Sequence, residues 1–365
     1  MSANQLYLTC FEQVAQLRPH EWVTRLRNLA WLMVGILKSR SVHLSRVANE
    51  IPGPAKDPSL VRRLGRFLAN PAVRVREWYE PVARRLLAAM AETVGEIRLI
   101  VDGSKIGFHH QLLMVSVAFR RRAIPIAWTW VRHSRGHSTG YKQKALLAAV
   151  RSLMPAGTPV LLVGDSEFGS VEVLRQLDVW KWRYVLRQSG YDLVKLEGQG
   201  WRHFDRVVWY PGASLWLGPG LLTVKHAYPV NLLAHWQKGE EKPWLLATNL
   251  PTPAAALRAY RRRMWIEEMY GDFKGNGFDL DRSHLHHFAR LSRLTLAVAL
   301  LYVWLVSTGA RAIRNGQRHL VDRQDRRDLS IFQIGLRLIK RRLKNSLPIS
   351  PNWCPVYAVT KVSGS

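Results

Sequence analysis

The chain has 365 residues, 47% of them hydrophobic, so it is long enough and apolar enough to bury a sizeable core. Its formal net charge of +28 and pI near 10.9 favour a polyanionic partner, with nucleic acid first and an anionic membrane second. The two cysteines, Cys10 and Cys354, exclude both a disulfide framework and a zinc cluster of paired cysteines, and they fit a reducing cytoplasm.

The N-terminal segment lacks a basic stretch followed by a clean apolar run, so no secretion signal is expected. The most apolar stretch, residues 294–306, is shorter than the roughly 20 residues that a bilayer span needs. We therefore predict a buried core helix there, and no membrane as a partner.

The first 92 residues are predicted to form a helical region. Apolar residues recur at helical spacing over residues 21–38, and the following stretch is cut into short helices by Pro52, Pro54, Pro58 and Pro71. Its arginines are expected to face DNA, although a run of charges is also typical of a solvated helix face. These arginines are Arg62, Arg63, Arg66, Arg74 and Arg76.

After residue 95 the pattern changes to short apolar runs, which predict an α/β fold. Strands are expected at residues 97–104, 112–119 and 123–131, a helix at 139–154 and a fourth strand from 159. The first three are close enough for an antiparallel meander, and the helix is long enough for a crossover that puts the fourth strand beside the first.

Residues 182–249 read as strands separated by glycine and proline, which predicts a β-rich insert. A helix over about residues 253–273, the apolar core helix and a basic amphipathic helix follow. We predict a helical DNA-binding region at 1–92, a catalytic core at 93–310 with the insert at about 190–248, and a basic helical region at 311–365.

Two of the predicted strands end in aspartate. The run "LIVDGS" puts Asp102 at the end of the first strand, and "LLVGDSEFG" puts Asp165 at the end of the fourth. If these strands are neighbours, the carboxylates converge, and carboxylates so placed repel unless a cation lies between them. Oxygen ligands of this kind suit Mg²⁺, although an aspartate after a strand is also a common turn former.

The segment "YRRRMWIEEMYGDFKG" supplies further polar groups. In one helix, with roughly 100° per residue, Tyr260, Arg263, Glu267 and Lys274 fall on one face, whereas Glu268 points away from Glu267. Glu267 would be a third carboxylate, and Arg263 and Lys274 would hold phosphates. A surface helix with Arg–Glu pairs is the alternative, but it leaves the two aspartates unexplained.

The spacing of Tyr260, Arg263, Glu267 and Lys274 resembles the Tyr-Arg-Glu-Lys signature of bacterial DDE transposases of the insertion-sequence-four group. The rest of the chain is similar to that group too, from the helical N-terminal region to the β-rich insert that precedes the glutamate helix. The resemblance covers residues 97–305 well and the N-terminal region loosely.

The resemblance implies an RNase H-like core in which Asp102, Asp165 and Glu267 hold two Mg²⁺ ions, for which Mn²⁺ can substitute. The ions would activate water or a DNA 3′-OH for in-line attack on a phosphodiester. In this group the freed 3′-OH typically forms a hairpin at the transposon end, and the family's Tyr, Arg and Lys contact phosphates there. We carry those contacts onto Tyr260, Arg263 and Lys274.

The family's insert also offers an aromatic side chain to a flipped base, and such a base needs a π-platform. The available residues are Trp201, Trp209, Trp216 and Trp236, and the sequence does not choose among them.

Other signals are weaker. The histidines at 109, 110, 284, 286 and 287 do not have zinc-site spacing. Glu167 is either a loop carboxylate or a group supporting Asp165, and residues 133–144 form a basic, glycine-containing segment that can contact phosphate. The basic C-terminal helix suits DNA or a dimer contact better than anionic lipid.

The sequence therefore predicts a DNA transposase that binds the terminal inverted repeats of its element and cuts and rejoins DNA. Its expected partners are double-stranded DNA, as transposon ends and as target, and a second copy of the chain; its expected location is the bacterial cytoplasm, with the nucleoid. The alternatives are a structure-selective nuclease on the same core, without strand joining, and a non-catalytic DNA-binding regulator derived from a transposase.

Overall fold

A computed structural model describes residues 3–107, 110–132, 138–208 and 210–355. The chain divides into two compact units. The first comprises Met1–Val94, Ile106–His110 and Met269–Ser365, and the second comprises Gly95–Lys105 and Gln111–Glu268. Each unit is described by itself.

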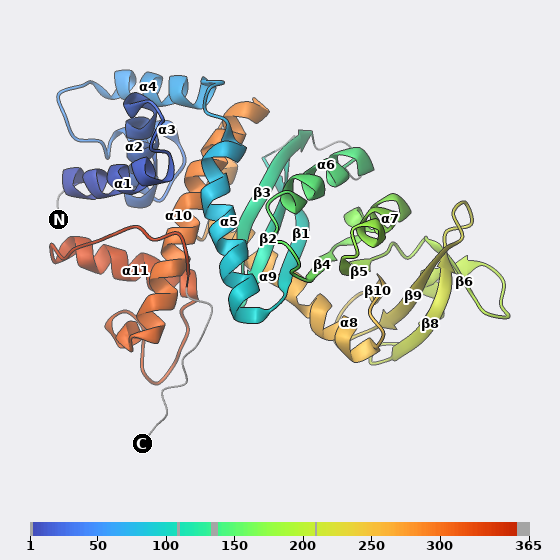
Figure 1. The fold of residues 1–365 in the computed structure, drawn as a ribbon. Helices are drawn as coiled ribbons and strands as arrows, with labels where there is room; N and C mark the ends of the chain where they lie inside the picture. Colours follow the sequence, from blue (N-terminus) through green and yellow to red (C-terminus); the bar gives the residue numbers. More distant parts are fainter. Residues whose placement is uncertain (1–2, 108–109, 133–137, 209, 356–365) are drawn as a thin grey trace. The chain divides into compact units, whose positions relative to one another are not determined.

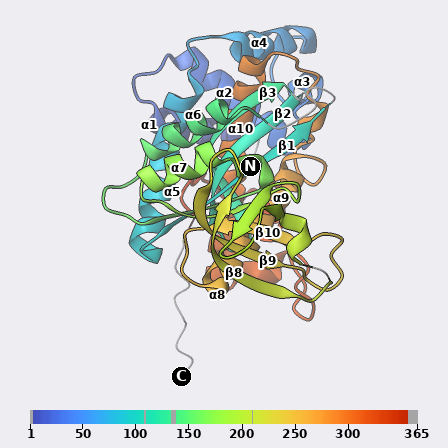
Figure 2. The ribbon, with the colours of Figure 1, turned by 90° about the vertical axis from the view of Figure 1, so that its right-hand side faces the viewer.

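The second unit is built on one mixed sheet of ten strands in the order β3-β2-β1-β4-β5-β10-β9-β8-β6-β7 (Figures 1 and 2). The strands are β1 (Ile97–Ile106), β2 (His110–Phe119), β3 (Arg122–Arg132), β4 (Val160–Gly164), β5 (Arg183–Arg187), β6 (Leu193–Leu196), β7 (Arg202–His203), β8 (Ser214–Leu222), β9 (Tyr228–His235) and β10 (Trp244–Thr248). The predicted α/β class is confirmed.

The order of the first strands follows from their connections. Only Arg120 and Arg121 separate β2 from β3, and both have positive φ angles of 41° and 64°, as a tight hairpin turn requires. Two residues cannot join parallel strands, so β2 and β3 are antiparallel. The fourth strand pairs with the first in parallel, as predicted, and β5 pairs in parallel with β4.

Two helices make the crossovers between these strands. Helix α6 (Gly140–Arg151) leads from β3 to β4, and α7 (Val171–Val179) leads from β4 to β5. Both crossovers move in the same direction along the strand order of the sheet. Since crossovers of this kind are nearly always right-handed, their helices are expected on the same face of the sheet, and α6 and α7 do contact each other.

The β-rich segment extends this sheet. Strand β10 pairs antiparallel with β5 and β9, and β9 pairs with β8. The predicted strands are present, and their backbone bonds make them a continuation of the same sheet as the first five strands. The functional boundaries proposed at residues 92 and 310 remain predictions.

The helix predicted over residues 253–273 is interrupted. Helix α8 (Pro253–Tyr260) and helix α9 (Met264–Phe273) are separated by a 3₁₀ turn, η3 (Arg261–Arg263). Because a 3₁₀ turn advances by about 120° per residue, a single α-helical projection does not hold across it. The turn packs against β4, and α8 against β4 and β5.

The first unit is helical. It contains α1 (Ala3–Leu17), α2 (Val23–Ser39), α3 (Leu44–Ala48), α4 (Asp57–Ala69), α5 (Val75–Val94), α10 (Phe288–Arg314) and α11 (Ile331–Lys344). Pro58 lies in the first turn of α4 and Pro71 follows its end, which is where proline is tolerated and where it stops a helix. The predicted helical N-terminal region and basic C-terminal helix are confirmed.

Helix α10 is the core of this unit. Within the described residues it is the one helix that is long and apolar enough to cross a membrane, but 83% of its most apolar window is buried inside the protein. Helices α2, α4, α5 and α11 contact it. The prediction of a buried core helix is therefore confirmed.

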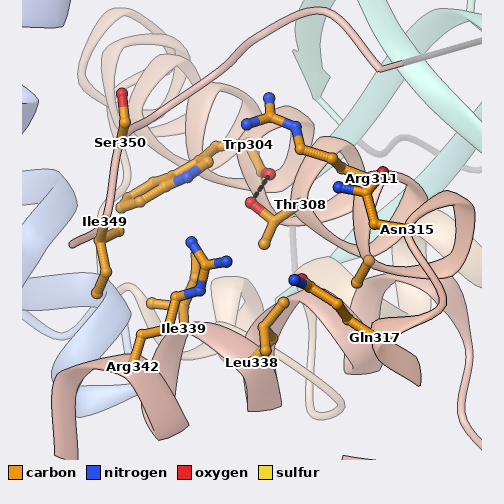
Figure 3. Close-up of a pocket in the computed structure, with 11 residues that line it drawn as sticks. Trp304, Thr308, Arg311, Asn315, Gln317, Leu338, Ile339, Arg342, Ile349 and Ser350 are labelled. Carbon is orange, nitrogen blue, oxygen red and sulfur yellow. Dashed lines mark hydrogen bonds between the residues drawn. The ribbon is translucent and has the colours of Figure 1, made fainter. Parts of the chain in front are cut away.

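A small cavity of about 90 Å³ lies between α10 and α11 (Figure 3). Arg311 and Arg342 line it, together with Thr308, whose hydroxyl donates to the carbonyl of Trp304 at 2.9 Å. It is far smaller than the roughly 300–1,000 Å³ of small-ligand sites, so we assign it no binding role.

Candidate active site

The backbone register brings Asp102 and Asp165 together. The parallel ladder of β1 and β4 ends at the pair Val101–Gly164, and each aspartate is the next residue in its strand. Neighbouring strands lie about 4.8 Å apart, so the two residues emerge side by side. One detail of the prediction is wrong: β1 continues to Ile106, so Asp102 lies within the strand and β4 alone ends at this point.

The carboxylate of Asp102 is buried and held in place. Its Oδ1 accepts from the backbone N–H of Gly103 at 2.8 Å, and its Oδ2 accepts from Nη1 of Arg263 at 2.9 Å. Asp102 is only 7% exposed. The strand and the guanidinium therefore fix one orientation of this carboxylate.

Arg263 joins Asp102 to Glu267. It is the last residue of η3, and its Nη2 donates to Oε1 of Glu267, one turn further along the chain. Arg263 is 9% exposed, whereas the Glu267 side chain is 46% exposed. The turn that interrupts the predicted helix thus directs a guanidinium between two carboxylates. The sequence predicts that the guanidinium of Arg263 holds phosphate; here it is paired with the two carboxylates.

Asp165 differs from the other two carboxylates. It precedes the 3₁₀ turn η1 (Ser166–Phe168), and its Oδ1 is buried with no hydrogen-bond partner among the residues that the structure describes. Buried polar atoms are nearly always paired in native proteins. This oxygen is therefore suited to a ligand.

Arg263 pairs with two of the three carboxylates, and burial and the neighbouring charges shift the pKa values of the site. Burial raises the pKa of Asp102 to about 7; Arg263 opposes the rise, and the charges of Asp165 and Glu267 add to it. Burial alone would lower the pKa of Arg263, but the surrounding acids, led by Asp102, raise it. Burial is therefore the main reason that Asp102 binds its proton more tightly, and the neighbouring acids are the reason that Arg263 does.

Tyr260 is buried near the charged groups of the site. It is 2% exposed, its hydroxyl has no partner among the described residues, and the ring of Trp244 meets its ring edge-on at 5.1 Å. Burial raises the pKa of its phenol, Arg263 opposes this, and Asp165 adds to it. The hydroxyl thus lies in the electrostatic field of the site but not at the protein surface.

The remaining residue of the predicted signature, Lys274, belongs to the first unit. It directly follows α9, and its backbone carbonyl accepts from the N–H groups of Gly277, Phe278 and Asp279. Burial lowers the pKa of its ammonium group, and Asp281 opposes this shift.

Glu167 supports the loop that follows Asp165. Its two carboxylate oxygens accept from Nε2 of Gln111 at 2.7 Å and from the backbone N–H of Ser138 at 2.8 Å. Its carbonyl accepts from Nε2 of Gln143 at 2.7 Å. These two glutamines were not picked out from the sequence, because single glutamines in a strand and a helix carry no pattern.

Three of the five arginines predicted to face DNA lie on α4 in the first unit, whereas Arg74 precedes α5 and Arg76 lies in its first turn. Arg62 and Arg66 are exposed, and Nε of Arg62 donates to the carbonyl of Pro58. Arg63 is more enclosed and donates from Nε to Oδ1 of Asn28 at 2.6 Å. Arg62 and Arg66 are therefore the two that α4 presents to solvent.

Among the described residues, the other candidates form no group that could hold a metal ion. Trp201, Trp216 and Trp236 are half-buried; Trp209, His109 and residues 133–137 lie outside the described residues. His284 packs its ring against His43, while Nε2 of His110 lies 3.1 Å from the carbonyl oxygen of His286.

The donor set of the site fits a divalent cation in its chemistry. All three acids offer oxygen ligands, and Oδ1 of Asp165 has no hydrogen-bond partner among the described residues. The three acids and Arg263 together carry two more negative than positive side chains. Within the described residues, no three His, Cys, Asp or Glu side chains lie close enough together to hold a metal ion. In this arrangement Arg263 forms ion pairs with Asp102 and Glu267. A cation that binds all three acids must therefore compete with Arg263.

Comparison with known proteins gives the family. The family model of the transposase DDE domain matches residues 95–304, more than half of the chain. No curated protein matches this sequence. Among solved structures, a piggyBac transposase synaptic complex with hairpin DNA is similar to this chain at a TM-score of 0.40 and 12% identity, over 100% of this chain and 84% of that one.

The matched segment contains every residue of the site, from Asp102 to Glu267 and Lys274. DDE transposases bind DNA, recombine it and depend in general on divalent metal ions. The chain therefore belongs to the transposase DDE domain family.

Proposed function

We propose that this protein is a transposase of the insertion-sequence-four group that binds the terminal inverted repeats of its own element, cleaves them and transfers the strands to target DNA. The observation that carries this proposal is the convergence of Asp102 and Glu267 on Arg263, with Asp165 next to Asp102 in register. Its second support is the family match over the same segment.

An RNase H-like core is part of the proposal. The order β3-β2-β1-β4-β5, with a tight β2–β3 hairpin and two parallel pairings at β4, supports it. The helix-borne acid Glu267 comes after the β-rich segment, as the Tyr-Arg-Glu-Lys pattern requires. The domain roles assigned to residues 1–92, 93–310 and 311–365 rest on the same resemblance.

Asp102, Asp165 and Glu267 would hold two Mg²⁺ ions, with Mn²⁺ as a substitute. Such ions neutralise charge at the scissile phosphate and make a bound water or a DNA 3′-OH a better nucleophile. The N–H of Gly103 would hold the carboxylate of Asp102 in place, and the hydrogen bond from Gln111 to Glu167 would hold the segment that follows Asp165. Asp102 and Asp165 would then need little reorganisation to bind metal. Arg263, once its Nη2 is released from Glu267 and its Nη1 from Asp102, would be close enough to the acids to bind a phosphate with both Nη groups.

The hairpin route and its aromatic platform belong to the same proposal. The described candidates Trp201, Trp216 and Trp236 are all half-buried, so a base would have to stack on a partly covered ring. Tyr260 and Lys274 would contact phosphates at the transposon end; for Tyr260, which is 2% exposed, this contact requires its hydroxyl to become accessible when DNA binds. We also propose a homodimer, since two ends have to be joined, and a cytoplasmic, nucleoid-associated location.

Product analysis on DNA that carries the element boundary tests the function. With Mg²⁺ or Mn²⁺, the protein should cut at the boundary, form hairpin ends and join them to a second DNA. Cleaved ends that are never joined would favour the nuclease, and ends that are bound but not cut would favour the regulator.

The matched variants are Asp102→Ala and Asp165→Ala. Both should bind the ends about as well as wild type, because neither residue lies on the proposed DNA-binding face of α4, but neither should cut. Full cleavage by either variant contradicts the assignment of the metal-binding acids.

A further inference from the structure

An exposed tryptophan borders a groove in the helical unit. Trp22 precedes α2 and is 71% exposed, although α2 itself is mostly buried. The groove has a volume of about 480 Å³ and runs between the start of α2 and α4. This volume is within the roughly 300–1,000 Å³ of small-ligand sites, so a nucleotide base with its sugar fits.

The groove is lined by cationic and amide side chains. Arg25 is paired with Glu21 at 2.7 Å and Arg63 with Asn28, so both are held in position. Arg66 makes no hydrogen bond or ion pair within the described part of the chain. Its guanidinium is available to an anion, and no carboxylate is among the lining residues.

A second groove, of about 470 Å³, shares Arg66 with the first. Arg62 and Arg290 line it, and the α4 face between them is formed by Gly65 and Ala69. A Cβ built at Gly65 meets nothing within 4 Å, so the helix surface is open there. Arg66 therefore lines both grooves, Arg62 and Arg290 line the second, and the exposed ring of Trp22 lines the first.

We propose that a single strand of DNA crosses α4 through these two grooves, with one unpaired base stacked on Trp22 and its neighbouring phosphates bound by Arg66, Arg62 and Arg290. A basic groove that follows the backbone, combined with an aromatic side chain that stacks a base, is how proteins bind single strands. The amides of Asn28 and Asn70 line the first groove and can hydrogen-bond base edges.

This occupant fits better than a duplex or a protein. A base in a duplex is already stacked on its neighbours and leaves the face of Trp22 without a partner. A protein partner would need acidic groups against three arginines, whereas every strand of DNA carries phosphates. The inference rests on DNA being the partner of the protein, but not on the three carboxylates.

Binding of a single-stranded oligonucleotide of about ten nucleotides tests the stacking. It carries a central 2-aminopurine, the fluorescence of which falls on stacking, and EDTA keeps cleavage out of the measurement. Wild type should quench this probe. Trp22→Ala should abolish the quenching and weaken binding about 5- to 150-fold, as expected for one stacked base, while Trp22→Phe retains most of both.

The matched control is Tyr191→Ala, which removes another highly exposed ring, 83% exposed, from the sheet unit. It should leave quenching and affinity unchanged. A Trp22→Ala protein that still quenches the probe overturns the inference. So does one whose affinities for single strands and for duplex DNA fall by the same factor. Thermal unfolding of both variants should match wild type, because both side chains are exposed.

The salt dependence separates the roles of ring and charge. Arg66→Ala should lower the slope of log K against log salt by about 0.7, the value for one phosphate contact on a single strand, and Trp22→Ala should leave the slope unchanged. An unchanged slope for Arg66→Ala contradicts the proposed path of the backbone.

The cleavage assay distinguishes this inference from the proposed function. A protein that cuts element ends with Mg²⁺ but does not quench the probe is a transposase without this single-strand site. A protein that quenches the probe through Trp22 but never cuts has the site without the proposed catalysis.

Discussion

At the residue scale, one guanidinium serves two carboxylates. Arg263 donates to Asp102 and to Glu267, and its pKa is raised by the acids around it. The sequence predicts Arg263 and Glu267 on one face of a single helix, whereas Arg263 ends the turn η3 and Glu267 lies in α9. The sequence could not predict the bond from Arg263 to Asp102, since 161 residues separate the two and only the fold brings them together.

Replacing Arg263 with methionine should destabilise the metal-free protein by about 3–5 kcal/mol, because buried Asp102 then loses its counter-charge. Added Mg²⁺ or Mn²⁺ should restore part of the loss, since a cation supplies the missing charge. Denaturant unfolding with and without metal measures both effects.

The matched control is Arg122→Met, which removes the 3.0 Å partner of Glu268. The Glu268 side chain is 58% exposed, so this change should cost less than about 1 kcal/mol through the ion pair. Equal losses for the two variants, or no recovery with metal, would contradict the electrostatic description of the site.

The pKa of Asp102 predicts how pH affects metal binding. Because that pKa is raised to about 7, Asp102 is protonated below pH 7 and ionised above it, and only the ionised form is a good ligand. Because one proton competes with the metal ion for the carboxylate of Asp102, Mn²⁺ binding should weaken about tenfold from pH 8 to pH 6. Calorimetric titration at both pH values measures this, with circular dichroism as the check on folding. An affinity independent of pH would show that Asp102 is not a ligand with this pKa.

At the element scale, α10 and α11 pack closely through two glycines. A Cβ at Gly335 would overlap the carbonyl oxygen of Leu305, and a Cβ at Gly309 would overlap that of Ile331. Gly335→Ala should therefore destabilise the protein at the upper end of the ~1–3 kcal/mol that overpacking costs, or beyond it.

Gly65→Ala is the matched comparison, because it makes the same substitution in a helix with open space around the new methyl group. It should stabilise the protein by up to about 1 kcal/mol, the difference in helix propensity. Urea unfolding of the two variants should give effects of opposite sign. A stable Gly335→Ala protein would contradict the close helix contact.

The elements were largely predictable because most of them carry local patterns. Apolar runs predict the strands, prolines predict the helix ends around α4, and an aspartate after the apolar run of each of two strands identifies two site residues, although β1 continues past Asp102. The turn η3 was not predictable, since "RRRMW" contains neither proline nor glycine and the interruption depends on packing against β4. The joining of β10 to β5 was also hidden, because edge pairing is decided by the whole sheet.

At the scale of the whole molecule, charge is the dominant property. With a net charge of +28, the protein should bind any duplex DNA by releasing counterions. Its affinity for a random duplex should fall by about a thousandfold or more between roughly 50 and 200 mM salt, as for proteins that contact six or more phosphates. Fluorescence anisotropy at several salt concentrations measures the slope, and an equal osmolality of sucrose is the control. An affinity that salt does not change would rule out the electrostatic basis of DNA binding.

The most direct test of the central claim is cleavage of a supercoiled plasmid carrying the DNA that flanks this gene, with Mg²⁺ or Mn²⁺, comparing wild type with Glu267→Gln and Glu268→Gln. The two glutamates are adjacent in α9, but only Glu267 shares Arg263 with Asp102, whereas Glu268 pairs with Arg122. We predict that wild type and Glu268→Gln cut at the element boundaries and that Glu267→Gln does not. Cleavage by Glu267→Gln at the wild-type rate, or its loss in Glu268→Gln alone, would contradict the site that we assign.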